Sequence, residues 1–342
     1  MKRNIKELTL EEFKEVLASW KEPVFRAEQI FSWIYQRGIS GFDQMSNLPV
    51  KLRQRLNENF TIFDLELAAA QESKDGTKKF LFKLQDDQFI EAVAIPSEKR
   101  LTGCISSQAG CKFACTFCAS GFLGFQRNLS CAEILEEVLY LKNNSSQPLT
   151  HIVFMGTGEP LDNYDSVLKA IRIINSDYAF KIGARRITIS TCGIIPGIEK
   201  LADEGLQVEL SVSLHGCDDQ TRSRLMPVNK KYPLKELFAQ LRQYVKKTNR
   251  QVTFEYILAK GVNSDLPSAR KLSTIVKGLN CKVNLIPVNP QKELGLEPPL
   301  KLDILFFRDA LVKSGVAVTL RRSRGQDIEA ACGQLRLRYE KD

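Results

Sequence analysis

Three closely spaced cysteines, Cys111, Cys115 and Cys118, restrict what this chain can form more than any other feature. Three residues separate the first two thiols and two residues separate the last two, and such a trio can ligate three irons of a 4Fe–4S cluster. The fourth iron then stays open for a substrate, such as the amino and carboxylate groups of S-adenosylmethionine (SAM), an arrangement typical of radical chemistry. A zinc loop that lacks one ligand and three unrelated core cysteines are the alternatives.

The composition indicates a globular, cytoplasmic protein of about two domains, or one large barrel with an appendage. Hydrophobic residues make up 43% and charged residues 26% of the 342-residue chain, which allows a sizeable core. No apolar run approaches the roughly 18 residues of a membrane span, and the charged start, Met1 to Glu7, has no signal-peptide core. In the cytoplasm the nine cysteines are expected to serve as thiols, ligands or catalysts, not as structural disulfides.

The basic balance of the chain favours a polyanionic partner such as RNA. The formal net charge is +9, although many globular proteins are basic without binding nucleic acid. A group of C-terminal arginines strengthens the RNA interpretation, because it brackets a cysteine-containing segment and does not follow one plain helix face. Its members are Arg321, Arg322, Arg324, Arg336 and Arg338.

The chain divides into four segments. Residues 1–60 predict a small helical domain that we expect to contact RNA, with its aromatic side chains mainly in its own core. Residues 61–97 alternate as strands do and predict a β linker, followed by a barrel core over 98–326 and a C-terminal segment over 327–342. Glu91 interrupts an apolar strand of the linker. Either an edge strand turns this carboxylate to water, or the carboxylate is a base placed for catalysis.

From about residue 100 strands and helices alternate, which predicts an α/β fold with a parallel sheet that right-handed crossovers curl into a partial (β/α)6 TIM-like barrel. Strands are expected at 101–106, 151–155, 186–191, 208–214, 251–258 and 282–288, with a seventh at 316–320. Helices are expected at 130–143, 162–175, 196–204, 233–248, 265–278 and 301–314. Local signals mark the helix ends: a capping box at Ser130 and Glu133, Pro196 at a helix start, and Gly205, Gly278 and Gly315 after helix ends.

Unusual residues collect where the strands run into their loops, which is where the active sites of such barrels lie. The second strand enters the Gly-Thr-Gly-Glu turn of residues 156–159, whose glycines would let backbone carbonyls approach a cationic amine. Three further strands end in candidate site residues: Ser190; Ser213, Leu214 and His215; and Asn289. Their joint position beside the cysteine loop predicts one site.

Two more cysteines bear on this site. Cys104 lies seven residues before the cluster loop, at the barrel mouth, and Cys332 follows the last strand. Two thiols that converge on an open-iron site suggest a covalent carrier and a thiol that resolves it. Two buried core cysteines are the alternative. The cysteines interpreted as structural are Cys131, Cys192, Cys217 and Cys281, the second with the least support.

Together these residues make the chain resemble the radical SAM RNA methyltransferases of the RlmN/Cfr family. The resemblance covers nearly the whole chain, including the helical N-terminal domain. It is carried by residues 103–130 (GCISSQAGCKFACTFCASGFLGFQRNLS), 156–160 (GTGEP), 213–215 (SLH), 226–233 (MPVNKKYP) and 330–335 (AACGQL).

The resemblance implies a role for each candidate residue. One 4Fe–4S cluster would be ligated by Cys111, Cys115 and Cys118. Two SAM molecules would be used per turnover, and the residues that hold SAM would be Gly158, Glu159, Ser190, Ser213, Leu214, His215 and Asn289. Cys332 would carry the methyl group as S-methylcysteine, Glu91 would accept a proton, and Cys104 would resolve the RNA adduct through a transient disulfide with Cys332.

The implied reaction makes 2-methyladenosine in 23S rRNA and in tRNA through a 5′-deoxyadenosyl radical. C2 of adenine lies between two ring nitrogens and is electron-poor, so it cannot attack the sulfonium methyl of SAM by ordinary displacement. A flavodoxin-type electron donor is implied, and a monomer is expected. The alternatives are methylation at C8, as in the Cfr branch, a radical activase, and a non-enzymatic iron–sulfur or zinc RNA-binding protein, which would need a fourth ligand.

Overall fold

The computed structural model describes residues 2–122, 124–288, 295–321, 324–325 and 327–328. Its α-helices are α1 (Leu10–Ser19), α2 (Arg26–Phe31), α3 (Val50–Asn59), α4 (Ala119–Phe122), α5 (Cys131–Asn143), α6 (Tyr164–Asn175), α7 (Ile195–Asp203), α8 (Asp219–Leu225), α9 (Leu234–Thr248), α10 (Leu266–Val276) and α11 (Lys301–Lys313). Its strands are β1 (Arg3–Asn4), β2 (Phe60–Thr61), β3 (Glu66–Glu72), β4 (Lys78–Lys83), β5 (Phe89–Ser97), β6 (Arg100–Cys104), β7 (Gln108–Gly110), β8 (Phe125–Asn128), β9 (Leu149–Phe154), β10 (Ile187–Thr191), β11 (Glu209–Ser213), β12 (Val252–Leu258), β13 (Cys281–Pro287) and β14 (Ala317–Leu320).

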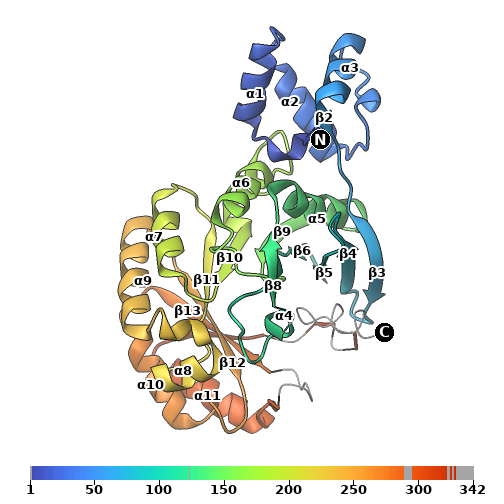
Figure 1. The fold of residues 1–342 in the computed structure, drawn as a ribbon. Coiled ribbons are helices and arrows are strands. Elements are labelled where there is room, and N and C mark those ends of the chain that lie inside the picture. Colours follow the sequence, from blue (N-terminus) through green and yellow to red (C-terminus); the bar gives the residue numbers. More distant parts are fainter. Residues whose placement is uncertain (1, 123, 289–294, 322–323, 326, 329–342) are drawn as a thin grey trace.

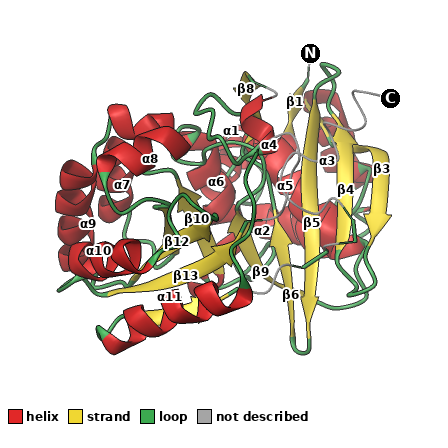
Figure 2. Cartoon of the chain, turned by 90° about the horizontal axis from the view of Figure 1, so that it is seen from below, coloured by secondary structure: helices red, strands yellow, loops and turns green. Residues whose placement is uncertain are grey.

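The centre of the molecule is one ten-stranded sheet with the order β14-β13-β12-β11-β10-β9-β6-β5-β4-β3. The strands from β6 to β14 in this order are parallel, and β5, β4 and β3 continue the sheet in antiparallel pairing. Helices lie along the outer side of the parallel strands, as in a partial (β/α) barrel (Figure 2). The predicted α/β barrel is confirmed, and the segment expected as a β linker belongs to the same sheet.

Local signals explain where the main helices begin and end. The Ser130 hydroxyl accepts a hydrogen bond from the Glu133 amide and the Glu133 carboxylate accepts one from the Ser130 amide, which is the predicted capping box at the start of α5. Helices α7, α10 and α11 are followed by Gly205, Gly278 and Gly315, all with positive φ angles that favour glycine. The predicted barrel strands and helices are therefore all present, with ends shifted by a few residues.

The N-terminal helices form a separate layer at one end of the barrel, next to α5 and α6 (Figure 1). Glu7 accepts a hydrogen bond from the Ala132 amide at 2.9 Å, at the N-terminus of α5, where a negative charge is favourable. Lys6 is buried and forms an ion pair with Glu136 of α5. Burial lowers the pKa of Lys6 to about 8. These contacts fix the small domain on the barrel.

The structure contains several short elements that the sequence analysis did not predict. The short antiparallel pair of β7 and β8 brackets the cysteine loop, and the helices α4 and α8 follow that loop and β11. Within the small helical domain, α2 is followed directly by a π-helical turn over Ser32–Gln36. Glu91 does not lie on an edge strand, because β5 pairs with β4 on one side and β6 on the other.

Candidate active site

A cavity of about 360 Å³ opens at the carboxyl ends of the parallel strands. Residues from the cysteine loop, from the ends of β6 and β9 to β13, and from β5 all contribute to it. The predicted site residues that line it are Cys104, Cys111, Cys115, Cys118, Gly158, Glu159, Ser190, Ser213 and His215. The fold therefore brings together most of the residues that the sequence pattern selects, as expected for the catalytic end of a βα barrel.

The cysteine loop between β7 and α4 is tied to its surroundings at several points. The Cys111 amide donates to the Gly124 carbonyl at 3.1 Å, and the Cys118 amide donates to the Cys115 carbonyl at 3.1 Å. The Thr116 amide donates to the Leu225 carbonyl at 2.9 Å, which links the loop to the end of α8. Gly110 has a φ of +80°, and a Cβ there would meet the Gly124 carbonyl oxygen at 1.7 Å. Only glycine fits this position.

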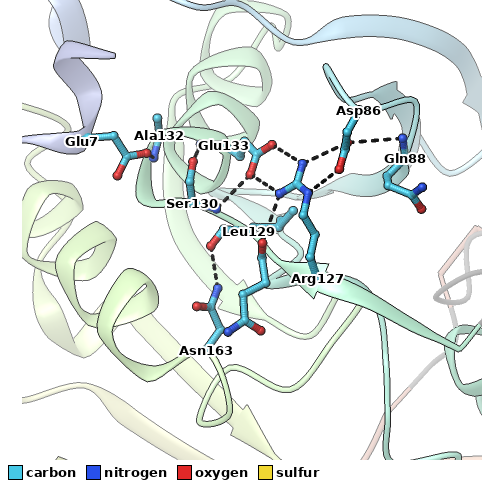
Figure 3. A network of polar contacts seen from close by, with 10 residues as sticks. Glu7, Asp86, Gln88, Arg127, Leu129, Ser130, Ala132, Glu133 and Asn163 are labelled. Carbon is cyan, nitrogen blue, oxygen red and sulfur yellow. Dashed lines mark hydrogen bonds and ion pairs between the residues drawn. The ribbon is translucent and has the colours of Figure 1, made fainter. Parts of the chain in front are cut away.

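A network of charged and polar side chains anchors the β7–β8 pair that brackets the cysteine loop (Figure 3). Arg127 on β8 donates to Asp86 in the β4–β5 turn at 2.5 Å and to Glu133 at the start of α5 at 2.7 Å. The hydrogen bonds to these two carboxylates raise the pKa of Arg127. The side-chain amide of Asn163 donates to the backbone carbonyls of Ser107 and Leu129 at 2.7 and 2.8 Å. The β7–β8 pair is thus tied to the β4–β5 turn, to the start of α5 and to Asn163, which precedes α6.

The three thiols provide a donor set that fits an iron–sulfur cluster. Soft thiolates are the ligands that iron–sulfur clusters prefer. Burial raises the pKa of Cys111 to about 12 and raises that of Cys115 as well, and the neighbouring Cys118 and Glu159 act in the same direction. A bound cation reverses this preference, because it favours the deprotonated thiol. In the described part of the chain no three Cys, His, Asp or Glu side chains are grouped for a single metal ion; a four-iron cube is larger.

The glycine turn after β9 is packed against the segment after β6. A Cβ at Gly156 would lie 2.6 Å from the Ile105 carbonyl oxygen, and a Cβ at Gly158 would lie 2.7 Å from the Gln108 amide nitrogen. Gly158 also has a φ of +102°. The Gln108 side-chain oxygen accepts a hydrogen bond from the Glu159 amide at 2.9 Å. The glycines therefore serve a close approach of two backbones as well as access to the cavity.

Glu159 is buried, with 3% of its surface exposed. Its carboxylate accepts hydrogen bonds from the amides of Leu161 at 3.0 Å and Cys192 at 2.6 Å, so it joins the ends of β9 and β10. Burial raises the pKa of Glu159, and these hydrogen bonds oppose the rise. Cys192, the least secure of the cysteines interpreted as structural, also lines the cavity.

His215 follows β11 and adopts a φ of +54°, which is unusual for a residue other than glycine. Its Nδ1 accepts a hydrogen bond from the Ile257 amide at 3.1 Å, and its ring meets Phe117 of the cysteine loop edge to face at 4.6 Å. Burial, together with the charge of Arg222, lowers the pKa of His215 to about 3. The ring is therefore neutral with its proton on Nε2, and it can donate one hydrogen bond at the cavity.

Arg222 on α8 is a residue of the site that the sequence pattern did not single out. Its side chain is fully buried and donates to the Cys192 carbonyl and to the Asn229 side chain, both at 2.7 Å, and to the Ser213 carbonyl at 3.3 Å. It thereby links the loops after β10 and β11. No signal in the polar segment Asp219–Leu225 distinguishes this arginine from exposed Arg224.

Glu91 is buried in β5, and its carboxylate forms an ion pair with Lys79 of β4 at 3.0 Å. Side chains alternate along a strand, so Glu91 lies on the same face of β5 as Val93 and Ile95, which line the cavity. Glu91 itself is not among the lining residues. The alternative in which this carboxylate faces water is wrong, because 2% of Glu91 is exposed.

The other predicted residues are distributed differently. Leu214 is fully buried and belongs to the hydrophobic core, and its backbone amide donates to the Glu255 carbonyl. Asn289 and Cys332 lie outside the described residues, as do Arg322, Arg336 and Arg338. Arg321 and Arg324 both line the cavity, which places positive charge at its rim. None of the helices in the described residues has the length and hydropathy that crossing a bilayer requires.

Comparison with known proteins gives a consistent result over the whole chain. Residues 105–269 match the Radical SAM superfamily, and residues 3–62 match the ribosomal RNA large subunit methyltransferase N-terminal domain. Curated relatives from Staphylococcus aureus strains JH9 and Newman, each described as a probable dual-specificity RNA methyltransferase RlmN, are 46% identical over 98% of this chain and 93% of their own length. The crystal structure of a radical SAM methyltransferase from Sphaerobacter thermophilus superposes with a TM-score of 0.92 and 42% identity, covering 97% of this chain and 98% of that one.

Proposed function

Because the chain belongs to the RlmN family of radical SAM RNA methyltransferases, we propose that it makes 2-methyladenosine in both 23S rRNA and tRNA. The enzyme class is that of a SAM-dependent RNA methyltransferase. The single observation that carries the proposal is the cavity in which the three loop cysteines, Glu159, His215 and Cys104 meet. It combines a cluster donor set, a ligand pocket and a separate thiol in one place.

In this proposal Cys111, Cys115 and Cys118 hold the 4Fe–4S cluster, which when bound supplies the electron that splits SAM into methionine and a 5′-deoxyadenosyl radical. Gly158, Ser190 and Ser213 line the same cavity and are suited to hold SAM. The Nε2 hydrogen of His215 provides a further donor to the bound ligand. Glu159 acts through its position, because its carboxylate oxygens accept hydrogen bonds from two backbone amides.

Two cysteines of the chain would carry the methyl group and release the product. The thiolate of Cys332 attacks the methyl carbon of a first SAM, which leaves as S-adenosylhomocysteine, and the methyl group becomes S-methylcysteine. After that methyl group loses a hydrogen atom to the 5′-deoxyadenosyl radical, its carbon bonds to C2 of the adenine. The resulting adduct radical would give one electron back to the oxidised cluster and its C2 proton to a base. Attack by the Cys104 thiolate on the Cys332 sulfur then breaks the sulfur–carbon bond and leaves a disulfide for a reductant to open. The position of Cys104 in the cavity wall supports this role.

Glu91 would accept the C2 proton of the adduct. Its support is its location on the cavity-facing side of β5 and its ion pair with the buried Lys79. A carboxylate in the middle of an apolar, double-paired strand is costly unless it has such a partner. A base at this place is reachable from a nucleotide bound at the cavity mouth only after the adenine leaves its stack, as enzymes acting on bases require.

The remaining parts of the proposal concern partners. Two SAM molecules are used per turnover, one as methyl donor and one as radical source, and a flavodoxin-type protein supplies electrons. A net charge of +9 and the cavity residues Arg321 and Arg324 suit an RNA substrate, with binding that weakens as salt rises. The enzyme would act as a cytoplasmic monomer.

The proposal is tested with protein whose cluster has been reconstituted anaerobically. We expect wild type to convert unmodified 23S rRNA and tRNA to products whose digests contain 2-methyladenosine by mass spectrometry. 8-Methyladenosine would assign the chain to the other regiochemistry of the wider family. Cys332→Ala should cleave SAM without methylating RNA, and Cys104→Ala should accumulate a covalent protein–RNA adduct. Methylation by the first variant would rule out the carrier, and absence of an adduct in the second would rule out the resolving thiol.

A further inference from the structure

A row of polar side chains crosses the inner face of the barrel at one level of four neighbouring parallel strands. Ser213 on β11 is in register with Glu255 on β12, Glu255 with Asn284 on β13, and Asn284 with Thr319 on β14. Barrel interiors at this depth are ordinarily packed with Val, Ile and Leu. A charged residue at such a position therefore requires an explanation.

Two hydrogen bonds converge on one oxygen of Glu255, one from Asn284 of the row and one from Ser211, which lies two residues before Ser213 on the same face of β11. The Ser211 hydroxyl donates to Oε1 at 2.8 Å and the Asn284 amide donates to the same oxygen at 3.2 Å. The side-chain oxygen of Asn284 in turn accepts a hydrogen bond from the Thr319 hydroxyl. These contacts orient the Asn284 side-chain amide and fix the position of the Glu255 side chain.

The other oxygen of Glu255 has no such partner. Oε2 is buried and accepts no hydrogen bond from the residues that the structure describes. The residue is 5% exposed and lines the cavity of the active site. An unsatisfied buried acceptor costs on the order of 1–3 kcal/mol, and more when it is charged. Such a group is retained where a ligand donor satisfies it. The second buried carboxylate of the cavity, Glu159, differs, because both its oxygens accept hydrogen bonds from backbone amides.

The position of Glu255 selects the part of the ligand that it meets. Strand β12 is separated from β6, which leads to the cysteine loop, by β9, β10 and β11. At roughly 4.8 Å per strand step, Glu255 lies far around the curved sheet from the thiols that would receive the methionine end of SAM. Ile257, Ile286 and Val288 line the cavity just beyond it, and their apolar side chains suit a purine ring. The ligand donors at this end of SAM are the exocyclic amino group of the adenine and the ribose hydroxyls, and the ribose lies between the purine ring and the methionine end.

We propose that Glu255 is a positioning residue whose Oε2 accepts a hydrogen bond from a ribose hydroxyl of SAM. The inference rests on the proposed function, since it takes SAM as the ligand of the cavity. A carboxylate is a strong acceptor for a ribose hydroxyl. The polar row then fixes the carboxylate, the carboxylate fixes the ribose, and the 5′ carbon of the nucleoside keeps a constant direction toward the reacting atoms.

The test measures binding and does not depend on methylation. Cluster-loaded wild type and Glu255→Gln are titrated calorimetrically with S-adenosylhomocysteine and with its 2′-deoxy and 3′-deoxy analogues. Glu209→Gln, at the opposite end of β11, is the matched control. We expect Glu255→Gln to weaken binding of S-adenosylhomocysteine roughly 10- to 100-fold, and the control to leave it unchanged. The analogue that lacks the anchored hydroxyl should bind wild type and Glu255→Gln about equally.

Equal binding of S-adenosylhomocysteine to wild type and Glu255→Gln would overturn the inference, and so would an equal loss with all three ligands. Iron content and melting temperature check that the variant is folded. If it is not, wild type alone decides: a loss with one deoxy analogue supports the inference, and no loss with either overturns it. Failure of wild type to bind S-adenosylhomocysteine at all would reject the proposed function together with this inference.

Discussion

Replacing Arg222 with Met should destabilise the enzyme strongly, although methionine is also unbranched and has a similar volume. The guanidinium is fully buried and makes two short hydrogen bonds of 2.7 Å, to the Cys192 carbonyl and to the Asn229 side chain. Burial lowers the pKa of Arg222, and its hydrogen-bond partners are carbonyl and amide oxygens. Methionine would fill the space and leave both acceptors without a donor.

The expected loss follows from these two acceptors. Each buried acceptor left unsatisfied costs about 1–3 kcal/mol, and removing a buried charge returns part of this because the guanidinium no longer has to be desolvated. A net loss of about 3 kcal/mol in the free energy of unfolding is expected, which for a chain of this length lowers the melting temperature by about 4 °C. The loss also frees the loops that follow β10 and β11, which carry Cys192 and His215.

Differential scanning calorimetry of wild type, Arg222→Met and Arg224→Met provides the assay. Arg224 lies two residues further along α8 and is exposed, so its substitution should change stability by less than about 0.5 kcal/mol. Arg222→Met should in addition weaken S-adenosylhomocysteine binding, because the two linked loops line the cavity. The reasoning fails if the two variants melt within 1 °C of each other.

Two further substitutions probe the support of the site. Burial raises the pKa of Glu137 well above normal, so the folded state binds a proton that the unfolded state releases above about pH 4.5; its contribution to stability falls as pH rises from there, by up to about 1.4 kcal/mol per unit. Glu137→Gln should remove that slope. The free energies of unfolding of variant and wild type are measured by urea titration between pH 5 and 8, and an equal change with pH in both proteins would contradict the prediction. Gly158→Ala should destabilise the folded protein by more than about 1 kcal/mol and reduce cluster retention, because its Cβ would meet Gln108. The control is Gly183→Ala, where the new Cβ would have nothing within 4 Å. Equal iron content in the two variants would count against the close-approach argument.

Elements that depend on local signals could be predicted from the sequence. The capping box at Ser130, the glycines after helices and the period of apolar residues all act within a few residues, and the barrel strands and helices follow them. The partners of strands are not local. The segment 61–97 predicts strands, but only the fold shows that β5 pairs with β6 and extends the barrel sheet, which buries Glu91.

The candidate site could be predicted from the sequence at positions where a residue type in a given pattern has one main functional role. Closely spaced thiols and a carboxylate after a glycine turn have few other roles, and they meet in the cavity. Arg222 was not predictable, because a buried arginine that binds carbonyls looks like a surface arginine in sequence. Glu255 carries the signal that singled out Glu91, a lone carboxylate in an apolar strand, and that signal could have found it.

The central claim is that the methyl group passes through a protein-bound carbon radical, and isotope content tests it most directly. The cluster-loaded enzyme is supplied with SAM whose methyl group carries three deuterium atoms, and the methylated adenosine is analysed by mass spectrometry. The radical step removes one hydrogen atom from the methyl group on Cys332, and a proton replaces it when the product is released. The account predicts 2-methyladenosine that retains two deuterium atoms. Retention of all three would indicate direct transfer and contradict the account.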